Sequence, residues 1–158
     1  MITSDPKELT VQLEKRLAEI AETQLLVGIP KEAMSTEEKG VYLADIADKN
    51  NFGSYSEHIP ARPFGSTTVP VFKDKIMDFF QKEMADALKG KRAVKQAFDR
   101  VGFVVAGFMK QNLSTGKWAP NAPLTIKLKG SSKPLIDTGE MRRAITWVSK
   151  KIRGSKDV

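Results

Sequence analysis

The sequence has no cysteine and only one histidine, His58. Without cysteine, neither a disulfide framework nor a thiolate metal site can form. A single histidine leaves too few ligands for an ordinary zinc site. No serine or cysteine nucleophile is paired with His58, although general-base chemistry needs a positioned partner. A Gly-rich phosphate loop and a nucleophile elbow are also missing. These absences predict a protein that is not an enzyme and that holds no cofactor or metal.

Long apolar runs are absent as well. The longest, from Val101 to Met109, is under half of the roughly 20 residues that a membrane-spanning helix needs. Hydrophobic residues make up 41% and charged residues 28% of the 158 positions, which is lean for a compact globule. We therefore expect a single domain, residues 1–158, with a modest core and surface loops. No membrane contact is expected, and a reducing cytoplasm suits the composition.

Positive charge is concentrated near the C-terminus. Residues 126–158 contain nine Lys and Arg against three Asp and Glu, a net charge of +6, so the rest of the chain contributes only +1 of the total of +7. A basic segment of this kind suggests an acidic partner surface or nucleic acid. A solvated tail explains the charge equally well, because exposed charges are easily hydrated. Residues 150–158 are expected to be a mobile C-terminal tail.

Helical periodicity is strongest in three stretches. Residues 6–23 follow a capping Asp5 and place leucines on one face. Residues 72–88 and 92–113 repeat apolar side chains at the same spacing, and the second would span roughly 30 Å at about 1.5 Å per residue. A shorter helix is expected over residues 41–49.

Strands are predicted at residues 25–29 and 144–148, which are short, apolar and rich in β-branched or aromatic side chains. Apolar and basic residues alternate over residues 126–129, which predicts a strand with Lys127 and Lys129 on one face. The predicted fold class is α+β. It has a small antiparallel sheet packed against one long and two or three shorter helices, with an extended loop arm.

The predicted arm is residues 50–70, a loop rich in Gly, Pro, Ser and Thr. A structureless loop of this length is unusual in a small domain unless it is functional or disordered. Aromatic and apolar side chains anchor it, so we expect it to be ordered only against neighbouring subunits. A tryptophan after the longest helix either closes the end of the core or meets a neighbour. The expected interface residues are Tyr55, Ile59, Arg62, Phe64 and Trp118.

Residues 135–139 resemble the Asp-Thr-Gly loop of a retroviral-type aspartic protease. Such an enzyme needs two aspartates that share a proton, so a chain of this length would have to dimerise around the loop. It also needs a long β segment after the loop, but only residues 140–158 follow, and many are basic. We reject this function. We instead expect Asp137 or Thr138 to be the N-cap of a short helix that has Glu140 in its first turn.

Five phrases, in order along nearly the whole chain, carry a family resemblance. They are Val27-Gly28-Ile29-Pro30; Ala44-Asp45-Ile46-Ala47 with Asn51-Phe52-Gly53; Ile59-Pro60-Ala61-Arg62-Pro63-Phe64; Ala119-Pro120-Asn121-Ala122-Pro123-Leu124-Thr125-Ile126; and the segment from Lys129 to Trp147. In these residues the chain resembles the neck and tail-completion proteins of tailed bacteriophages, the Mu-like virion morphogenesis group. It departs from the group after Phe64, where Gly65-Ser66-Thr67-Thr68 replaces the usual buried residue and proline, so the path of this loop stays open.

The resemblance implies a structural virion protein of the head–tail connector. Copies would form a ring around the DNA channel and join or complete the tail at the head, after assembly in the host cytoplasm. The implied partners are further copies, other connector and tail proteins, and the double-stranded DNA in the lumen. A tail terminator that caps the tail tube and a free basic nucleic-acid-binding protein are the alternatives. Candidates for facing DNA or docking on the next ring are Lys127, Lys129, Arg142 and Arg143.

Overall fold

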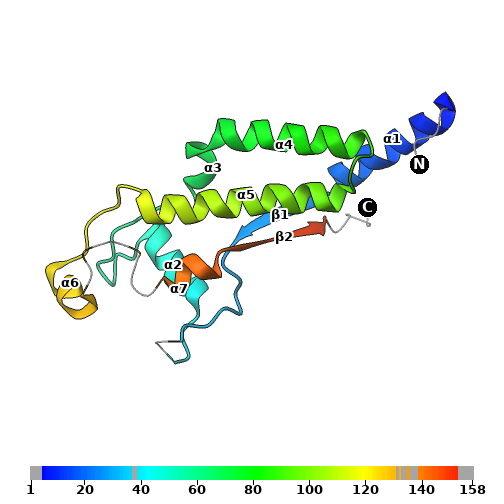
Figure 1. The fold of residues 1–158 in the computed structure, drawn as a ribbon. Coiled ribbons are helices and arrows are strands. Elements are labelled where there is room, and N and C mark those ends of the chain that lie inside the picture. The colour runs from blue at the N-terminus through cyan, green and yellow to red at the C-terminus, as the bar shows by residue number, and fades with distance from the viewer. Residues whose placement is uncertain (1–4, 37–38, 131, 133–134, 136–138, 153–158) are drawn as a thin grey trace. The chain divides into compact units, whose positions relative to one another are not determined.

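A computed structural model describes residues 5–36, 39–130, 132, 135 and 139–152. The chain folds as the predicted α+β class, with helices predominating and a sheet of two antiparallel strands (Figure 1). In order, the elements are α1 (Pro6–Ala21), β1 (Thr23–Gly28), α2 (Leu43–Phe52), α3 (Thr68–Val71), α4 (Lys73–Leu88), α5 (Val94–Thr115), α6 (Pro123–Lys129), α7 (Glu140–Ala144) and β2 (Thr146–Lys151). Over the described residues, no helix is both long and apolar enough to cross a membrane.

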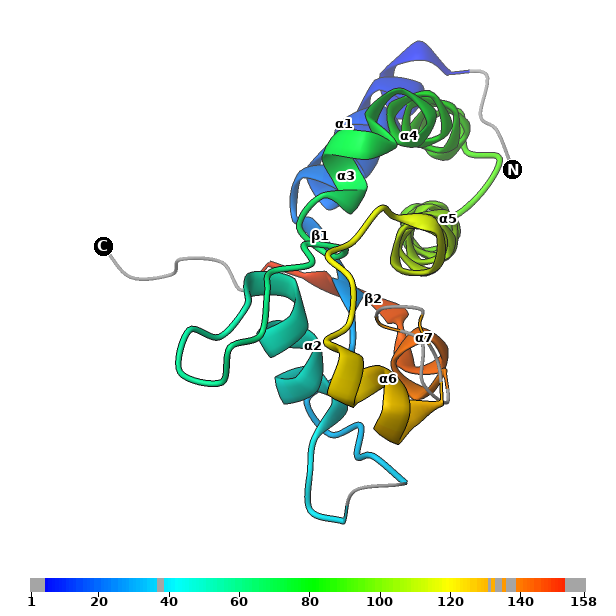
Figure 2. The ribbon, with the colours of Figure 1, turned by 90° about the vertical axis from the view of Figure 1, so that its left-hand side faces the viewer.

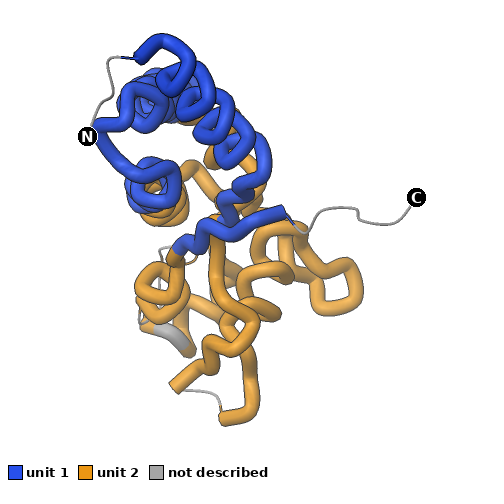
Figure 3. The backbone as a smooth tube through the Cα atoms, turned by 90° about the vertical axis from the view of Figure 1, so that its right-hand side faces the viewer, with its two compact units in different colours: residues 1–26, 73–104, 147–158 blue, residues 27–72, 105–146 orange. Residues whose placement is uncertain are grey.

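The chain groups into two compact units (Figure 3). Unit 1 comprises Met1–Leu26, Lys73–Val104 and Trp147–Val158, and unit 2 comprises Val27–Phe72 and Val105–Thr146. The first half of α5 therefore belongs to unit 1 and its second half to unit 2.

Unit 1 is built on the helix pair formed by α4 and the start of α5, which run antiparallel (Figure 1). Phe80 and Phe98 meet edge to face across this pair, with ring centroids 6.1 Å apart. The carboxylate of Glu83, only 1% exposed, accepts from Arg92 and Arg100 at 3.0 Å each. Charge pairing thus compensates the burial of an acidic side chain in the middle of α4.

The first helix and the sheet complete unit 1. Asp5 accepts a hydrogen bond from the backbone N–H of Lys7 at 2.9 Å, which confirms the predicted N-cap of α1. α1 packs against α4, where Arg16 donates to the carbonyl oxygen of Leu88 at 3.0 Å. On β2, the ring of Trp147 covers Gly102 so closely that a Cβ added to Gly102 would lie 2.4 Å from it. This glycine is therefore needed for the packing of the sheet on α5.

Two of the three predicted strands are confirmed, each within three residues of its expected bounds. The third is wrong, because residues 123–129 form helix α6. Pro123 stands in the first turn of α6 and Gly130 ends the helix in the left-handed region at φ 65°. These helix start and stop signals outweigh an alternation of only four residues. Lys127 and Lys129 therefore do not share a strand face.

Further predicted bounds also change. The helix expected over residues 72–88 is confirmed as α4, which begins one residue later because Phe72 ends α3. α2 continues to Phe52, so the segment expected as an arm starts only at Gly53. Lys150 and Lys151 belong to β2 and not to a mobile tail, while residues 153–158 lie outside the described residues. Residues 137 and 138, the predicted cap of α7, also lie outside them, and the cap position described is Gly139.

Candidate functional site

Arg62 lies at the buried centre of unit 2. Its side chain is 6% exposed. The guanidinium donates to the carbonyl oxygens of Ala119 at 2.9 Å and Pro120 at 3.2 Å, and to the side-chain oxygens of Asn50 and Asn121 at 3.1 Å each. Because all four acceptors are neutral, burial lowers the pKa of Arg62 from its ordinary value. A planar fork of donors suits several acceptors at once, so Arg62 joins the segment after α2 to the segment after α5.

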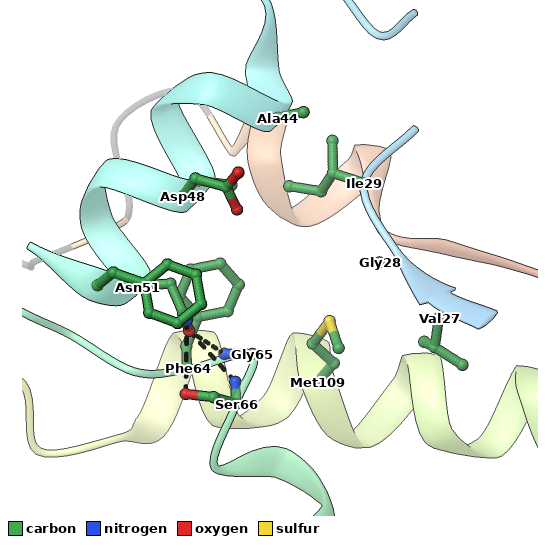
Figure 4. A pocket seen from close by; sticks show the side chains of 12 residues that line it. Val27, Gly28, Ile29, Ala44, Asp48, Asn51, Phe64, Gly65, Ser66 and Met109 are labelled. Carbon is green, nitrogen blue, oxygen red and sulfur yellow. Dashed lines mark hydrogen bonds between the residues drawn. The ribbon is translucent and has the colours of Figure 1, made fainter. Parts of the chain in front are cut away.

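Two buried asparagines bind the chain that follows Arg62. The side-chain oxygen of Asn51, on α2, accepts from the backbone N–H groups of Gly65 at 2.9 Å and Ser66 at 3.2 Å (Figure 4). The side-chain amide of Asn112, on α5, donates to the carbonyl oxygen of Phe64 at 2.7 Å. A loop whose backbone is bonded from both helices is held in place within its own chain. The departure from the family pattern after Phe64 therefore lies in an ordered turn.

A cavity of about 270 Å³ opens beside this turn, entirely within unit 2. Most of its lining is apolar, with Ile29 and Met109 opposite α2 (Figure 4). Asp48 is its one charged side chain, and the carboxylate points into the space between α2 and Ile29 (Figure 4). Phe52 lines the cavity while remaining 71% exposed. The site is thus an apolar hollow with a carboxylate and an aromatic ring at its solvent side.

No basic side chain among the described residues forms a salt bridge with Asp48. Other carboxylates of the chain do have partners: in unit 1 Glu83 has two arginines, and in unit 2 Glu57 pairs with Lys49 at 2.7 Å. Within the described residues, Asp48 has neither a hydrogen bond nor an ion pair. An apolar pocket with one available carboxylate favours a ligand that is mostly apolar and carries a single hydrogen-bond donor.

Residues 54–59 form a closed turn between α2 and Arg62. Ser54 and Ile59 exchange two backbone hydrogen bonds of 2.9 Å each. Gly53, at φ 77°, makes this possible, because a Cβ there would lie 2.9 Å from the backbone of both Ile59 and Ala61. The salt bridge between Lys49 and Glu57 ties the turn to α2. Tyr55, on this turn, is 97% exposed.

Glu140 fastens α7 to the segment before α2. Its carboxylate accepts from the hydroxyl of Ser35 at 2.9 Å, the backbone N–H of Thr36 at 2.9 Å, and the hydroxyl of Thr36. The hydrogen bonds from the Thr36 side chain and then from its backbone lower the pKa of Glu140 from its ordinary value. α7 also packs beside α2 (Figure 2). Glu140 thus helps to position the helix that carries Asp48.

The five predicted interface residues differ in their surroundings, and Ile59 is half-buried where it pairs with Ser54. Arg62 and Phe64 are buried in unit 2, at 6% and 3% exposure, where they contact their own chain. The prediction that these two residues are exposed for contact with a neighbouring subunit is wrong. Their partners lie in the same chain, on α2, α5 and the segment after α5. Trp118 donates to the carbonyl oxygen of Leu113 at 3.2 Å and covers Gly116, so it closes the end of a helix. Tyr55 remains available to a neighbour.

The predicted basic residues lie on two short helices of unit 2. Lys127 is exposed on α6, and Arg142 and Arg143 are exposed on α7. Arg142 donates to the hydroxyl of Ser114 at 3.1 Å. Lys129 ends α6, and its side chain lies outside what is described.

The sequence did not identify Asn51, Asn112 or Asp48 as site residues. A faint signal exists for the asparagines, because each interrupts an otherwise apolar helical stripe. Asp48 gives no such signal, since an acidic residue on a short helix is usually solvated. Across the described ranges, no group of three or more acidic, histidine or cysteine side chains is placed to hold a metal ion.

No family model, curated protein or solved structure matches this chain.

Proposed function

We propose that this protein is a structural component of the neck of a tailed bacteriophage, where its copies form a ring around the DNA channel and join or complete the tail at the head. The proposal rests on the resemblance in the five phrases named above. Its partners would be further copies, adjoining connector and tail proteins, and the genomic DNA. It would reside in the virion and, during assembly, in the host cytoplasm.

One observation supports this proposal more than any other: phrases far apart in the sequence meet in one site of unit 2. Arg62 of the third phrase holds Ala119 and Asn121 of the fourth. Residues of the first three phrases line the cavity together, among them Ile29, Ala47 and Phe64. Residues of four of the five phrases therefore form one connected packing centre. A scaffold that presents surfaces to neighbours needs such a centre.

Light scattering on the purified chain, followed by imaging of the particle that contains it, tests the proposal. We expect closed rings, or a monomer that joins rings only with connector or tail proteins, and labelled copies between head and tail. A tail terminator would instead be found at the end of a free tail tube where growth has stopped. In that case the free heads would lack it. Absence from particles would refute both.

Exposed Lys127, Arg142 and Arg143 favour a second candidate, a free nucleic-acid-binding protein. Such a protein would bind duplex DNA with an affinity that falls steeply with salt, with a log–log slope of about −0.9 for each phosphate contacted. A neck protein should grip DNA weakly, because phosphate contacts carry no sequence information and must let the genome pass. Titrating a labelled duplex at several salt concentrations separates the two functions.

A further inference from the structure

We propose that the C-terminal end of α5 carries a phosphate patch, in which Arg142, Lys110 and Lys117 contact the backbone of duplex DNA. The inference rests on the proposed function, in which DNA passes through the ring, and it names the side chains that would touch it. All three belong to unit 2. The inference also assigns different roles to Arg142 and Arg143, which the sequence alone does not distinguish.

The guanidinium of Arg142 is exposed but is held in position against α5. Its Nε donates to the hydroxyl oxygen of Ser114 at 3.1 Å, and that hydroxyl donates in turn to the carbonyl oxygen of Lys110 at 2.9 Å. The terminal nitrogens of Arg142 make no hydrogen bond to any described residue. A planar fork of donors suits the oxygens of a phosphate. Arg142 therefore presents a binding group that loses little freedom when an anion arrives.

Two lysines flank the contact between Arg142 and Ser114. Lys110 lies one helical turn before Ser114, on the same face of α5, and is half-buried. Lys117 follows just beyond the end of the helix and is exposed. Within the described part of the chain, neither lysine forms a salt bridge. Their charges are therefore available to an anion that also reaches the fork of Arg142.

The phosphate patch belongs to a part of the chain with almost only positive charge. Residues 100–136 include six Lys and Arg and no Asp or Glu. In unit 2, Val105–Thr146 has seven basic against two acidic residues, a net charge of +5, whereas Val27–Phe72 has four against six, a net charge of −2. Protein surfaces usually mix both signs, but duplex DNA carries one negative charge for about each 1.7 Å of its length. Uniform positive charge thus fits a phosphate backbone better than the surface of a neighbouring protein.

Arg143 has a different role, although it directly follows Arg142. It interacts electrostatically with Glu140, three residues earlier on α7, a spacing that brings two side chains together on one face of a helix. Part of the charge of Arg143 is thus compensated within its own chain, whereas Arg142 contacts only the neutral hydroxyl of Ser114. The two arginines therefore form a matched pair for an experiment, because they carry the same charge at adjacent positions.

Titrating a labelled DNA duplex of mixed sequence at several salt concentrations measures the number of phosphate contacts. At a log–log slope of about −0.9 for each contact, three contacts predict a slope of about −2.7, which is a loss of about 40-fold in affinity between 50 and 200 mM salt. Arg142→Gln should reduce the slope to about −1.8, and so should Lys110→Gln and Lys117→Gln singly. Arg143→Gln, the matched control, should leave the slope at the wild-type value.

Arg142→Lys separates the fork from the charge. The charge is kept, so the slope should stay at the wild-type value, while the affinity should fall a few-fold because an ammonium group cannot bind Ser114 and present a planar fork to a phosphate. Urea unfolding midpoints close to that of the wild type should show that each variant keeps the fold.

Equal slopes for Arg142→Gln and Arg143→Gln, or no affinity of the wild type for the duplex at about 50 mM salt, would overturn the inference. If Arg142→Gln leaves the slope unchanged while heads and tails stay unjoined, the patch docks on an acidic protein surface, and the inference is again wrong. A protein that shows the expected slopes but is absent from particles would overturn only the proposed neck function. The phosphate patch would then belong to a free DNA-binding protein.

Discussion

Replacing Arg62 by lysine keeps a positive charge but removes the planar fork that makes four hydrogen bonds. An ammonium group is a single point, so it cannot reach Asn50 on one side and Ala119, Pro120 and Asn121 on the other. We expect at least two of the four hydrogen bonds to be lost. At about 1.5–3 kcal/mol for each hydrogen bond to a charged group, Arg62→Lys should lower the free energy of unfolding by about 3 kcal/mol.

Urea unfolding of the isolated chain measures this loss, with the midpoint and slope fitted together. Arg142→Lys is the matched control, because Arg142 belongs to the same unit but is exposed and makes one hydrogen bond, to Ser114. Its effect should stay within about 0.5 kcal/mol. Hydrogen exchange should show protection of the backbone N–H groups of Gly65 and Ser66 in the wild type, and faster exchange there in Arg62→Lys.

The opposite result has a clear meaning. If Arg62→Lys leaves the stability of the isolated chain unchanged but prevents assembly, Arg62 acts between subunits, as the sequence alone predicts. The burial and the four hydrogen bonds would then not describe the free protein. A loss of stability in the isolated chain instead supports its role as the bond between two segments of unit 2.

Three further predictions concern other parts of the chain. Gly102→Ala should destabilise by about 1–3 kcal/mol through overpacking against Trp147, whereas Gly107→Ala, on the same helix but with open space around it, should stabilise by about 0.5–1 kcal/mol; thermal unfolding followed by tryptophan fluorescence compares them. Glu83→Gln should cost about 3 kcal/mol, because two arginines lose their buried anion, and exposed Asp78→Asn serves as its control in urea unfolding. Because hydrogen bonds lower the folded pKa of Glu140, its stabilising effect is complete above the ordinary glutamate pKa and is lost as the pH falls through the lowered value; Glu140→Gln should flatten the acid limb of stability against pH, and an unchanged limb would contradict this.

Local signals in the sequence were sufficient for most of the secondary structure. Asp5 and Pro6 mark the start of α1, and apolar periodicity locates α4 and α5, because caps and amphipathic spacing act within a few residues. The short alternation before Gly130 was misread as a strand. Pro123 and Gly130 mark the start and end of a helix. Four alternating residues fit a helix or a strand equally well, so these flanking residues decide between the two.

The tertiary structure alone decided the character of the site. Arg62 and Phe64 lie in a Pro- and Gly-rich loop, where local rules predict exposure. Their burial depends on acceptors nearly sixty residues later in the chain and on Asn112 of α5. The cavity that brings Ile29, Asp48 and Met109 together is likewise made by four separate segments. Sequence spacing describes neighbours along one element, whereas burial and pocket shape depend on contacts between distant elements, and those form only when the chain packs.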